Sequence, residues 1–268
     1  MMNTKKAIIV TSFGTSYNET RQKTLDKIEG DIAENFPDWD VRRAYTSKMV
    51  IKKLANRDGM IVDYIDKAIE RLIDEGYTDV IVQPTLIMNG IEYEDIVRIS
   101  KGYRDSFNTL SVGAPLLSEE KDFDEMTQII TEDIRADANS LSGSEPLLVL
   151  MGHGTEHYAN GAFPELYLKL QLGGHRDVAV TTVEGFPRFE DLGRMIEGHD
   201  GKDAVVAPLM IVAGDHVLND MAGDSPESLK SLMEGMGYIT KPLIKGLAEY
   251  GSVRRMFIRH VEEAMKKD

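Results

Sequence analysis

The sequence predicts an α/β fold of two similar lobes, each a small parallel sheet flanked by helices. Short apolar or β-branched runs alternate with longer stretches of helical spacing along the 268 residues, as in βα units. The run 147–151 is apolar at every position, which is typical of a strand buried on both faces of a parallel sheet. Motifs of the first half also recur in the second half. These observations together favour a duplicated α/β unit over a single sheet.

In the first half, β-branched runs predict the strands and apolar residues three or four apart predict the helices. Ser47 is a typical N-cap and Gly76 a typical C-cap, so each marks a helix end. The expected strands are 7–10, 39–45, 79–83 and 110–112, and the expected helices are 19–35, one after Ser47, 62–75, 92–106 and 122–138.

The second half repeats this alternation around the central run. The expected strands are 147–151, 178–183, 204–207 and 239–243, the expected helices are 163–172, 189–197, 226–236 and 253–266, and 208–224 is a long loop. The segment 139–145 is rich in Ser and Gly and has no apolar period, so it is the expected linker. The predicted lobes are therefore 1–138 and 139–268, with the last helix free to pack back on the first lobe.

The two halves align at their strand ends. The segment 10–15 aligns with 150–155, and 80–90 aligns with 205–214. In this alignment Phe13 stands opposite His153 and Glu92 stands opposite His216. We therefore expect a cleft between the lobes, with imidazoles on one wall and an aromatic ring and a carboxylate on the other.

Composition excludes several function classes. With 31 basic and 45 acidic residues the net charge is -14, which argues against a nucleic-acid or anionic-membrane surface. The chain has no cysteine, so any metal must be held by nitrogen and oxygen ligands. The apolar run 7–10 is too short for a signal peptide or a membrane span. We expect a cytoplasmic protein.

Three candidate ligands follow three different strands of the second half: His153, Glu184 and His216. Parallel strands end at one edge of a sheet, so these side chains should meet there. Two imidazoles and a carboxylate suit a borderline divalent metal with open positions, or acid/base work. The alternative for His153 is a capping or turn role between its flanking glycines.

Basic residues cluster near the second strand of this acidic chain: Arg42, Arg43, Lys48, Lys52 and Lys53. A local basic patch can serve as counter-charge for substrate carboxylates, with Arg43 and Lys48 as the candidates. The alternative is a solvated helix face.

Several motifs together resemble the anaerobic, class II cobalt chelatases of cobalamin biosynthesis. They are Ser-Phe-Gly-Thr-Ser (12–16), the basic segment 42–54, Val-Gln-Pro-Thr (82–85), Met-Gly-His-Gly-Thr-Glu-His (151–157), Thr-Val-Glu-Gly (182–185) and the segment 209–224. The resemblance implies the two-lobed class II chelatase fold and ATP-independent insertion of Co2+ into sirohydrochlorin, with the metal as substrate and no organic cofactor.

The same resemblance implies roles for individual residues. His153, Glu184 and His216 match the family's metal-binding positions, and the two histidines and Glu184 are the candidates for catalysis. Phe13 and Glu92 are expected to contact the tetrapyrrole. Residues 86–88 depart from the family pattern and leave the metal open.

Other functions stay open at this point. Iron or nickel insertion into the same ring is the nearest alternative, and a metal-dependent hydrolase could use the same three ligands. A two-lobed solute-binding protein would share the architecture, but the absence of a signal peptide counts against it. A homo-oligomer is left open, and no nucleic-acid or membrane partner is expected.

Overall fold

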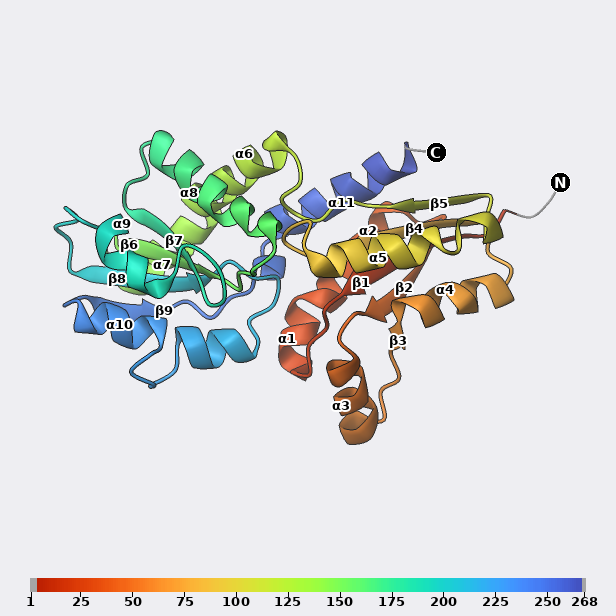
Figure 1. The fold of residues 1–268 in the computed structure, drawn as a ribbon, viewed down its shortest axis with the longest axis horizontal. Coiled ribbons are helices and arrows are strands. Elements are labelled where there is room, and N and C mark those ends of the chain that lie inside the picture. The colour runs from red at the N-terminus through yellow and green to blue at the C-terminus, as the bar shows by residue number, and fades with distance from the viewer. Residues whose placement is uncertain (1–3, 267–268) are drawn as a thin grey trace. The chain divides into compact units, whose positions relative to one another are not determined.

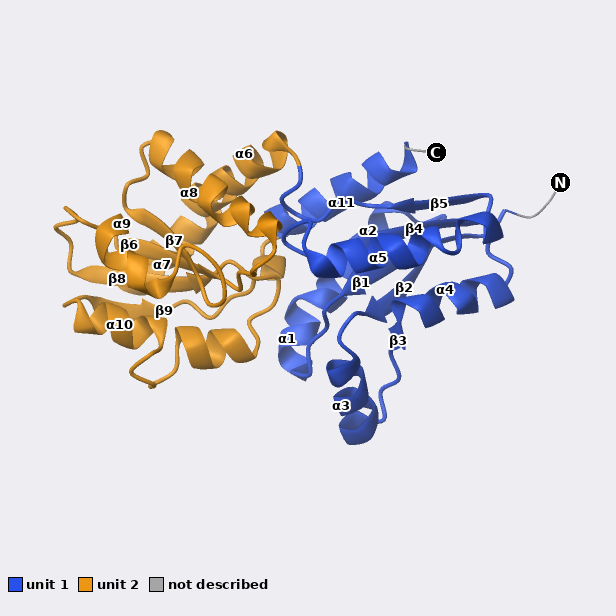
Figure 2. Cartoon of the chain, in the orientation of Figure 1, with its two compact units in different colours: residues 1–118, 251–268 blue, residues 119–250 orange. Residues whose placement is uncertain are grey.

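The computed structural model describes residues 4–266 and divides into two compact units (Figure 2). Unit 1 comprises the chain up to Ser118 and again from Gly251, and unit 2 comprises Glu119–Tyr250. Each unit is an α/β body with one parallel sheet, so the predicted fold class is confirmed.

The boundary between the units lies earlier than the sequence predicts. The expected linker begins at Asn139, but this residue lies inside helix α7 (Arg135–Ser142). Asp137 of that helix accepts hydrogen bonds from Lys245 Nζ at 2.7 Å and from the Tyr250 hydroxyl at 3.0 Å. Because these bonds tie α7 to the body of unit 2, the Ser-rich composition there marks a helix end and not a domain boundary.

Unit 1 is built on a five-stranded sheet in the order β3-β2-β1-β4-β5 (Figure 1). Its strands are β1 (Lys6–Ser12), β2 (Asp40–Tyr45), β3 (Asp63–Tyr64), β4 (Asp79–Pro84) and β5 (Thr109–Val112), and all neighbours run parallel. The sequence does not predict β3. Its two residues pair with the end of β2, which delays the start of the expected helix 62–75 to Ile65.

Helices complete unit 1. They are α1 (Asn18–Lys23), α2 (Leu25–Asn35), α3 (Lys48–Asp58), α4 (Ile65–Asp74), α5 (Ile91–Lys101), the short turn η1 (Arg104–Ser106) and α11 (Gly251–Met265). Apolar residues of α4 and α5 pack with Ala7 and Ile9 of β1 in one core, while α2 and α11 lie side by side. No helix within residues 4–266 has the length and apolar character needed to cross a membrane.

Unit 2 is built on four strands in the order β7-β6-β8-β9. They are β6 (Leu147–Gly152), β7 (Val178–Thr182), β8 (Asp203–Pro208) and β9 (Ile239–Pro242). β6 pairs in parallel with β7 on one side and with β8 on the other. This confirms the prediction that the three strands preceding His153, Glu184 and His216 are neighbours.

The helices of unit 2 also form two layers. One face carries α6 (Glu120–Ile129), the π-helical turn η2 (Ile130–Ile134), α7 and α8 (Ala162–Leu172); the other carries α9 (Leu192–Met195), η5 (Val217–Met221) and α10 (Leu229–Gly235). Short turns η3 (Tyr158–Gly161), η4 (Phe189–Asp191) and η6 (Leu247–Glu249) complete the unit. Two expectations were wrong in detail, because 189–197 forms only short helical turns and the expected loop 208–224 contains η5.

The duplication expected from the motifs is visible in the backbone. Strands β2-β1-β4-β5 have the same chain order as β7-β6-β8-β9. The amide of Ser47 donates to the Phe13 carbonyl at 3.2 Å, and the amide of Glu184 donates to the His153 carbonyl at 2.8 Å. Phe13 therefore occupies the place of His153, and Ser47 the place of Glu184.

Candidate metal site

Three strand ends of unit 2 bring the predicted ligands together. His153 follows β6 directly, Glu184 lies just beyond β7, and His216 lies beyond β8. The rings of His153 and His216 meet edge to face with centroids 4.6 Å apart, and Glu184 Oε2 lies 3.9 Å from His153 Nδ1. The prediction that these side chains share one edge of the sheet is confirmed, whereas their chemical roles stay predictions.

Glycines on both sides of His153 are required by close packing. A Cβ on Gly152 would lie 2.3 Å from the ring of Phe163. Gly154 has φ +79°, a left-handed conformation that favours glycine, and a Cβ there would lie 2.5 Å from the Gly185 amide nitrogen. The loop carrying His153 is therefore pressed against the loop carrying Glu184.

The imidazole of His153 has a defined hydrogen-bonding arrangement. Its Nδ1 lies 2.9 Å from the Gly154 carbonyl oxygen. A carbonyl only accepts, so Nδ1 carries the proton of the neutral ring and donates it. The lone pair is then on Nε2, where it is available to a metal ion.

Asn160, which is not among the site residues predicted from the sequence, connects the loops of His153 and Glu184. Its Oδ1 accepts from the Thr155 amide at 3.1 Å, and its Nδ2 donates to the Phe186 carbonyl at 2.7 Å. The side chain is buried, so these hydrogen bonds are shielded from water. Nothing in the local sequence signals this role, because the partners lie in separate loops.

His216 lies at the start of η5, where the sequence predicts an irregular loop. Its Nδ1 lies 2.7 Å from Oδ2 of Asp220, one helical turn later. Asp220 is not among the site residues predicted from the sequence, although its spacing of four residues from His216 is a signal for contact within a helix.

Binding of one ion by all three predicted ligands would require a side-chain movement. Within residues 4–266 no three His, Cys, Asp or Glu side chains stand in a ready-made metal-binding arrangement. Glu184 approaches the Nδ1 edge of His153, whereas the lone pair lies on Nε2. The Glu184 side chain is 59% exposed, so rotation about its side-chain bonds meets little obstruction.

The predicted substrate contacts in unit 1 lie at its strand ends. Phe13 follows β1 and is 48% exposed, and Glu92 lies in the first turn of α5 after β4. Lys48 begins α3, is exposed, and places Nζ 4.8 Å from the ring centroid of Tyr64. All three side chains are at least partly accessible, and substrate contact by each stays a prediction.

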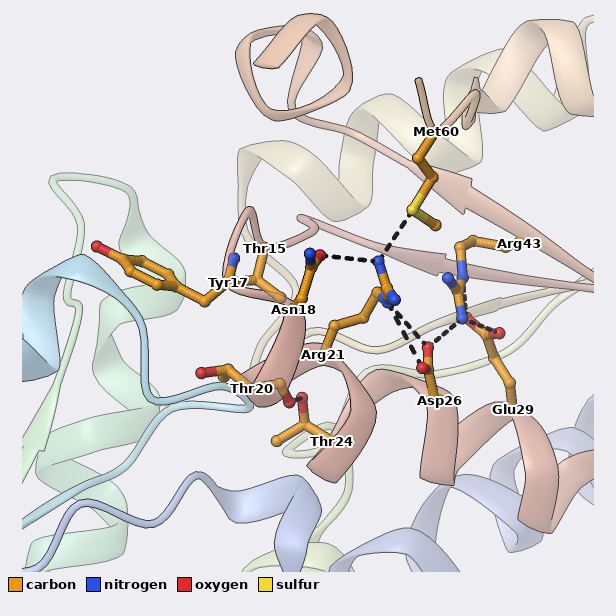
Figure 3. A network of polar contacts seen from close by, with 10 residues as sticks. All are labelled: Thr15, Tyr17, Asn18, Thr20, Arg21, Thr24, Asp26, Glu29, Arg43 and Met60. Carbon is orange, nitrogen blue, oxygen red and sulfur yellow. Dashed lines mark hydrogen bonds and ion pairs between the residues drawn. The ribbon is translucent and has the colours of Figure 1, made fainter. Parts of the chain in front are cut away.

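Arg43 has a different environment from the one expected. Its Nε and Nη2 donate to the two carboxylate oxygens of Glu29 at 2.7 and 2.6 Å, and Nη2 also pairs with Asp26 (Figure 3). Burial alone would lower the pKa of Arg43, but the hydrogen bond and charge of Glu29 outweigh it and raise that pKa. This environment disfavours the predicted substrate contact, because the guanidinium of Arg43 is already paired with the carboxylates of Glu29 and Asp26.

The physical reason is the position of Arg43 within its strand. It lies two residues before the end of β2, so its side chain points to one face of the sheet, where α2 supplies Asp26 and Glu29. Figure 3 shows Arg21 completing this network, with contacts to Asp26 and Asn18. The sequence could not reveal which helix covers that face.

Comparison with known proteins agrees with the motifs. The family model described as cobalt chelatase (CbiK) matches residues 6–266. The sirohydrochlorin cobaltochelatase of Salmonella typhimurium is 38% identical over 261 residues, covering 97% of each chain. The sirohydrochlorin cobaltochelatase CbiKC of Nitratidesulfovibrio vulgaris is 32% identical and covers 98% of this chain and 91% of its own.

Solved structures show the same fold. SirB from Bacillus subtilis with Fe3+ superposes with a TM-score of 0.65 at 16% identity, covering 97% of this chain and 95% of its own. CbiX, described as the terminal enzyme for siroheme biosynthesis in denitrifying bacteria, has a TM-score of 0.56 at 15% identity, covering 97% of this chain and 99% of its own. The resemblance read from the motifs is confirmed over nearly the whole length, and the chain belongs to the cobalt chelatase (CbiK) family.

Proposed function

We propose that this protein inserts Co2+ into sirohydrochlorin without ATP, as a sirohydrochlorin cobaltochelatase of anaerobic cobalamin biosynthesis. The observation that carries the proposal is the contact of His153 with His216, whose ring centroids lie 4.6 Å apart at the strand ends of unit 2. The names of the relatives that align over nearly the full length support it. The proposal needs no organic cofactor and assigns the reaction to the cytoplasm.

Metal insertion requires protein ligands that bind the ion reversibly. Insertion exchanges the first ligands of the ion for four ring nitrogens and removes two pyrrole protons, so bases are needed beside the metal. The imidazole and carboxylate ligands are supplied by His153, His216 and Glu184. The chain has no cysteine, whose thiolate would bind the ion more tightly. The two pyrrole protons need two acceptors, and each imidazole that leaves the metal as the ring takes it is free to accept one of them.

The proposed contacts with the macrocycle are made by residues of unit 1. Phe13 contacts the ring face, and Glu92 and Lys48 contact the periphery. The substrate bears many carboxylates and the protein carries a net charge of -14, so a local cation near the ring is needed to offset repulsion. Lys48 fits this role because it is exposed and begins a helix bearing other basic residues.

The decisive experiment is anaerobic incubation of the protein with sirohydrochlorin and Co2+, Fe2+ or Ni2+ in separate reactions. The absorption spectrum of the macrocycle should change with Co2+, and the initial rate should exceed the rate without protein. A faster rate with Fe2+ or Ni2+ would reassign the metal. Cleavage of ester substrates with no effect on the macrocycle would favour the hydrolase instead.

Substitution of Lys48 and Arg43 should separate substrate binding from folding. Lys48→Ala should raise the apparent KM for sirohydrochlorin about two- to fivefold, because an exposed ion pair contributes up to ~1 kcal/mol. Arg43→Ala should instead lower the free energy of unfolding of unit 1 by about 2–3 kcal/mol, since it leaves the largely buried Glu29 carboxylate without its cation, whereas Asp26 keeps its contact with Arg21. The single tryptophan, Trp39, lies in unit 1 and reports its unfolding by fluorescence.

The two variants serve as controls for one another. Lys48→Ala should unfold at the wild-type denaturant concentration, and folded Arg43→Ala should retain the wild-type KM. A raised KM in Arg43→Ala without loss of stability would support the substrate contact of Arg43 that the sequence predicts. An unchanged KM in Lys48→Ala would show that Lys48 does not bind substrate and only forms part of a solvated helix face.

A further inference from the structure

We propose that Asp220 is a positioning residue that holds the His216 ring with Nε2 presented to the metal. This inference rests on the proposed function, because it assigns a role relative to the metal that His216 binds. It begins from one contact, the 2.7 Å separation between His216 Nδ1 and Asp220 Oδ2.

The contact determines which ring nitrogen is available. An ionised carboxylate only accepts hydrogen bonds, so the neutral imidazole must carry its proton on Nδ1 and donate it to Asp220. The lone pair is thereby placed on Nε2, on the far side of the ring from the carboxylate. A histidine ligand whose other nitrogen donates to a carboxylate is oriented more firmly and is a stronger base toward the metal.

Both histidines of the site then share one arrangement with different acceptors. His153 Nδ1 faces the carbonyl of Gly154 at 2.9 Å, and His216 Nδ1 faces the carboxylate of Asp220. The carboxylate is the stronger acceptor, since a charged partner roughly doubles the strength of a hydrogen bond. His216 is therefore the more strongly oriented of the two ligands.

The backbone of η5 supports a specific role for Asp220. In unit 1 the buried residue of the turn after Glu92 is Ile96, four residues later. In unit 2 the buried residue Met221 comes five residues after His216, and η5 is π-helical, with the Ala222 amide bonded to the Val217 carbonyl. Asp220 directly precedes Met221, so a polar side chain stands beside His216 while the next side chain is buried in the core.

Exposure of Asp220 argues against a role in the fold alone. Its side chain is 41% exposed, so the core does not require it. Single π-helical turns occur often at functional sites. The proposal accounts for a π-helical turn that lies directly beside an oriented histidine.

The test compares Asp220→Asn with Asp224→Asn. Asp224 lies in the same segment and its side chain is 99% exposed, with Lys230 at 3.2 Å, so its substitution removes the same charge without touching His216. Co2+ affinity is measured on the protein alone by titration calorimetry, and sirohydrochlorin affinity by fluorescence quenching. The tautomer of His216 is read from two-bond 1H–15N spectra of the metal-free protein, with its signals assigned by their loss in His216→Ala.

We expect Asp220→Asn to bind Co2+ about 10- to 100-fold more weakly and to insert it correspondingly more slowly. Sirohydrochlorin affinity should be unchanged, and Asp224→Asn should behave as wild type throughout. In wild type and Asp224→Asn, His216 should show the tautomer protonated on Nδ1, and this preference should be lost in Asp220→Asn. A purely structural role would not change the tautomer.

Other outcomes decide against the inference in distinguishable ways. Wild-type Co2+ affinity and tautomer in Asp220→Asn would overturn it, as would equal losses in Asp224→Asn, which would point to net charge. Loss of the fold in Asp220→Asn would also overturn it, because a half-exposed positioning residue should not carry stability. If His216→Ala binds Co2+ as wild type does, the proposed metal site itself is wrong.

Discussion

Replacing His216 by alanine should slow Co2+ insertion by about 10²–10⁴-fold, the range expected when a group that transfers protons or holds the reacting metal is lost. Its ring lies at the strand ends of unit 2 beside His153, with centroids 4.6 Å apart. Removing it takes away a metal ligand together with a candidate proton acceptor. Insertion is followed by the absorption change of the macrocycle under anaerobic conditions.

The His153→Ala variant should show a loss of the same order. Sirohydrochlorin binding, measured by fluorescence quenching, should largely survive in both variants, because it depends on contacts to the periphery and face of the ring. The loss should therefore appear in turnover and in Co2+ affinity.

His175→Ala is the matched control for both variants. His175 precedes β7, whose first residue is Val178, so it lies at the opposite end of the strand from Glu184. This control should retain wild-type insertion. If His153→Ala or His216→Ala also inserts Co2+ at the wild-type rate, that histidine is structural and its assignment as a ligand is wrong.

Gly154→Ala should both destabilise unit 2 and abolish most of the insertion activity. The left-handed φ of +79° costs a residue with a Cβ about 1–2 kcal/mol. The added Cβ would also lie 2.5 Å from the Gly185 amide nitrogen and 2.7 Å from Thr182 Cβ, and backbone cannot rotate away as a flexible side chain can. Overpacking of this kind adds about 1–3 kcal/mol.

The loss of activity follows from where the clash falls. Gly154 adjoins His153 and Gly185 adjoins Glu184, so separating the two loops moves two proposed ligands at once. Asn160 bridges the same loops and would be strained by the same movement. Stability is measured by denaturant unfolding followed by circular dichroism, and activity by the insertion assay.

Gly143→Ala is the control that separates the effect of left-handed backbone strain from the steric clash expected in Gly154→Ala. Gly143 has φ +82° in the same unit, and nothing lies within 4 Å of the Cβ position. This variant should lose only the ~1–2 kcal/mol of left-handed strain and should retain insertion. Equal destabilisation in both variants, with activity retained in Gly154→Ala, would show that the two loops are not coupled through this contact.

Local pattern alone predicted much of the fold. The apolar run ending at Gly152 and the β-branched runs beside it identified the strands, because burial on both faces of a parallel sheet requires apolar residues throughout. Since parallel strands end at one edge, the order of the chain was then enough to predict that His153, Glu184 and His216 meet. The motifs also sufficed for the family, which the full-length comparisons confirm.

Tertiary structure alone decided the partners of polar side chains and the limits of the units. Arg43 pairs with Glu29 across two elements, Asn160 joins two loops, and α7 belongs to unit 2 despite its Ser-rich end. Sequence periodicity records which face of an element is buried, but not which element covers that face. A charged or amide side chain is satisfied by whatever donors and acceptors the packed neighbours bring, so its role became visible only when the sheets and helices were assembled.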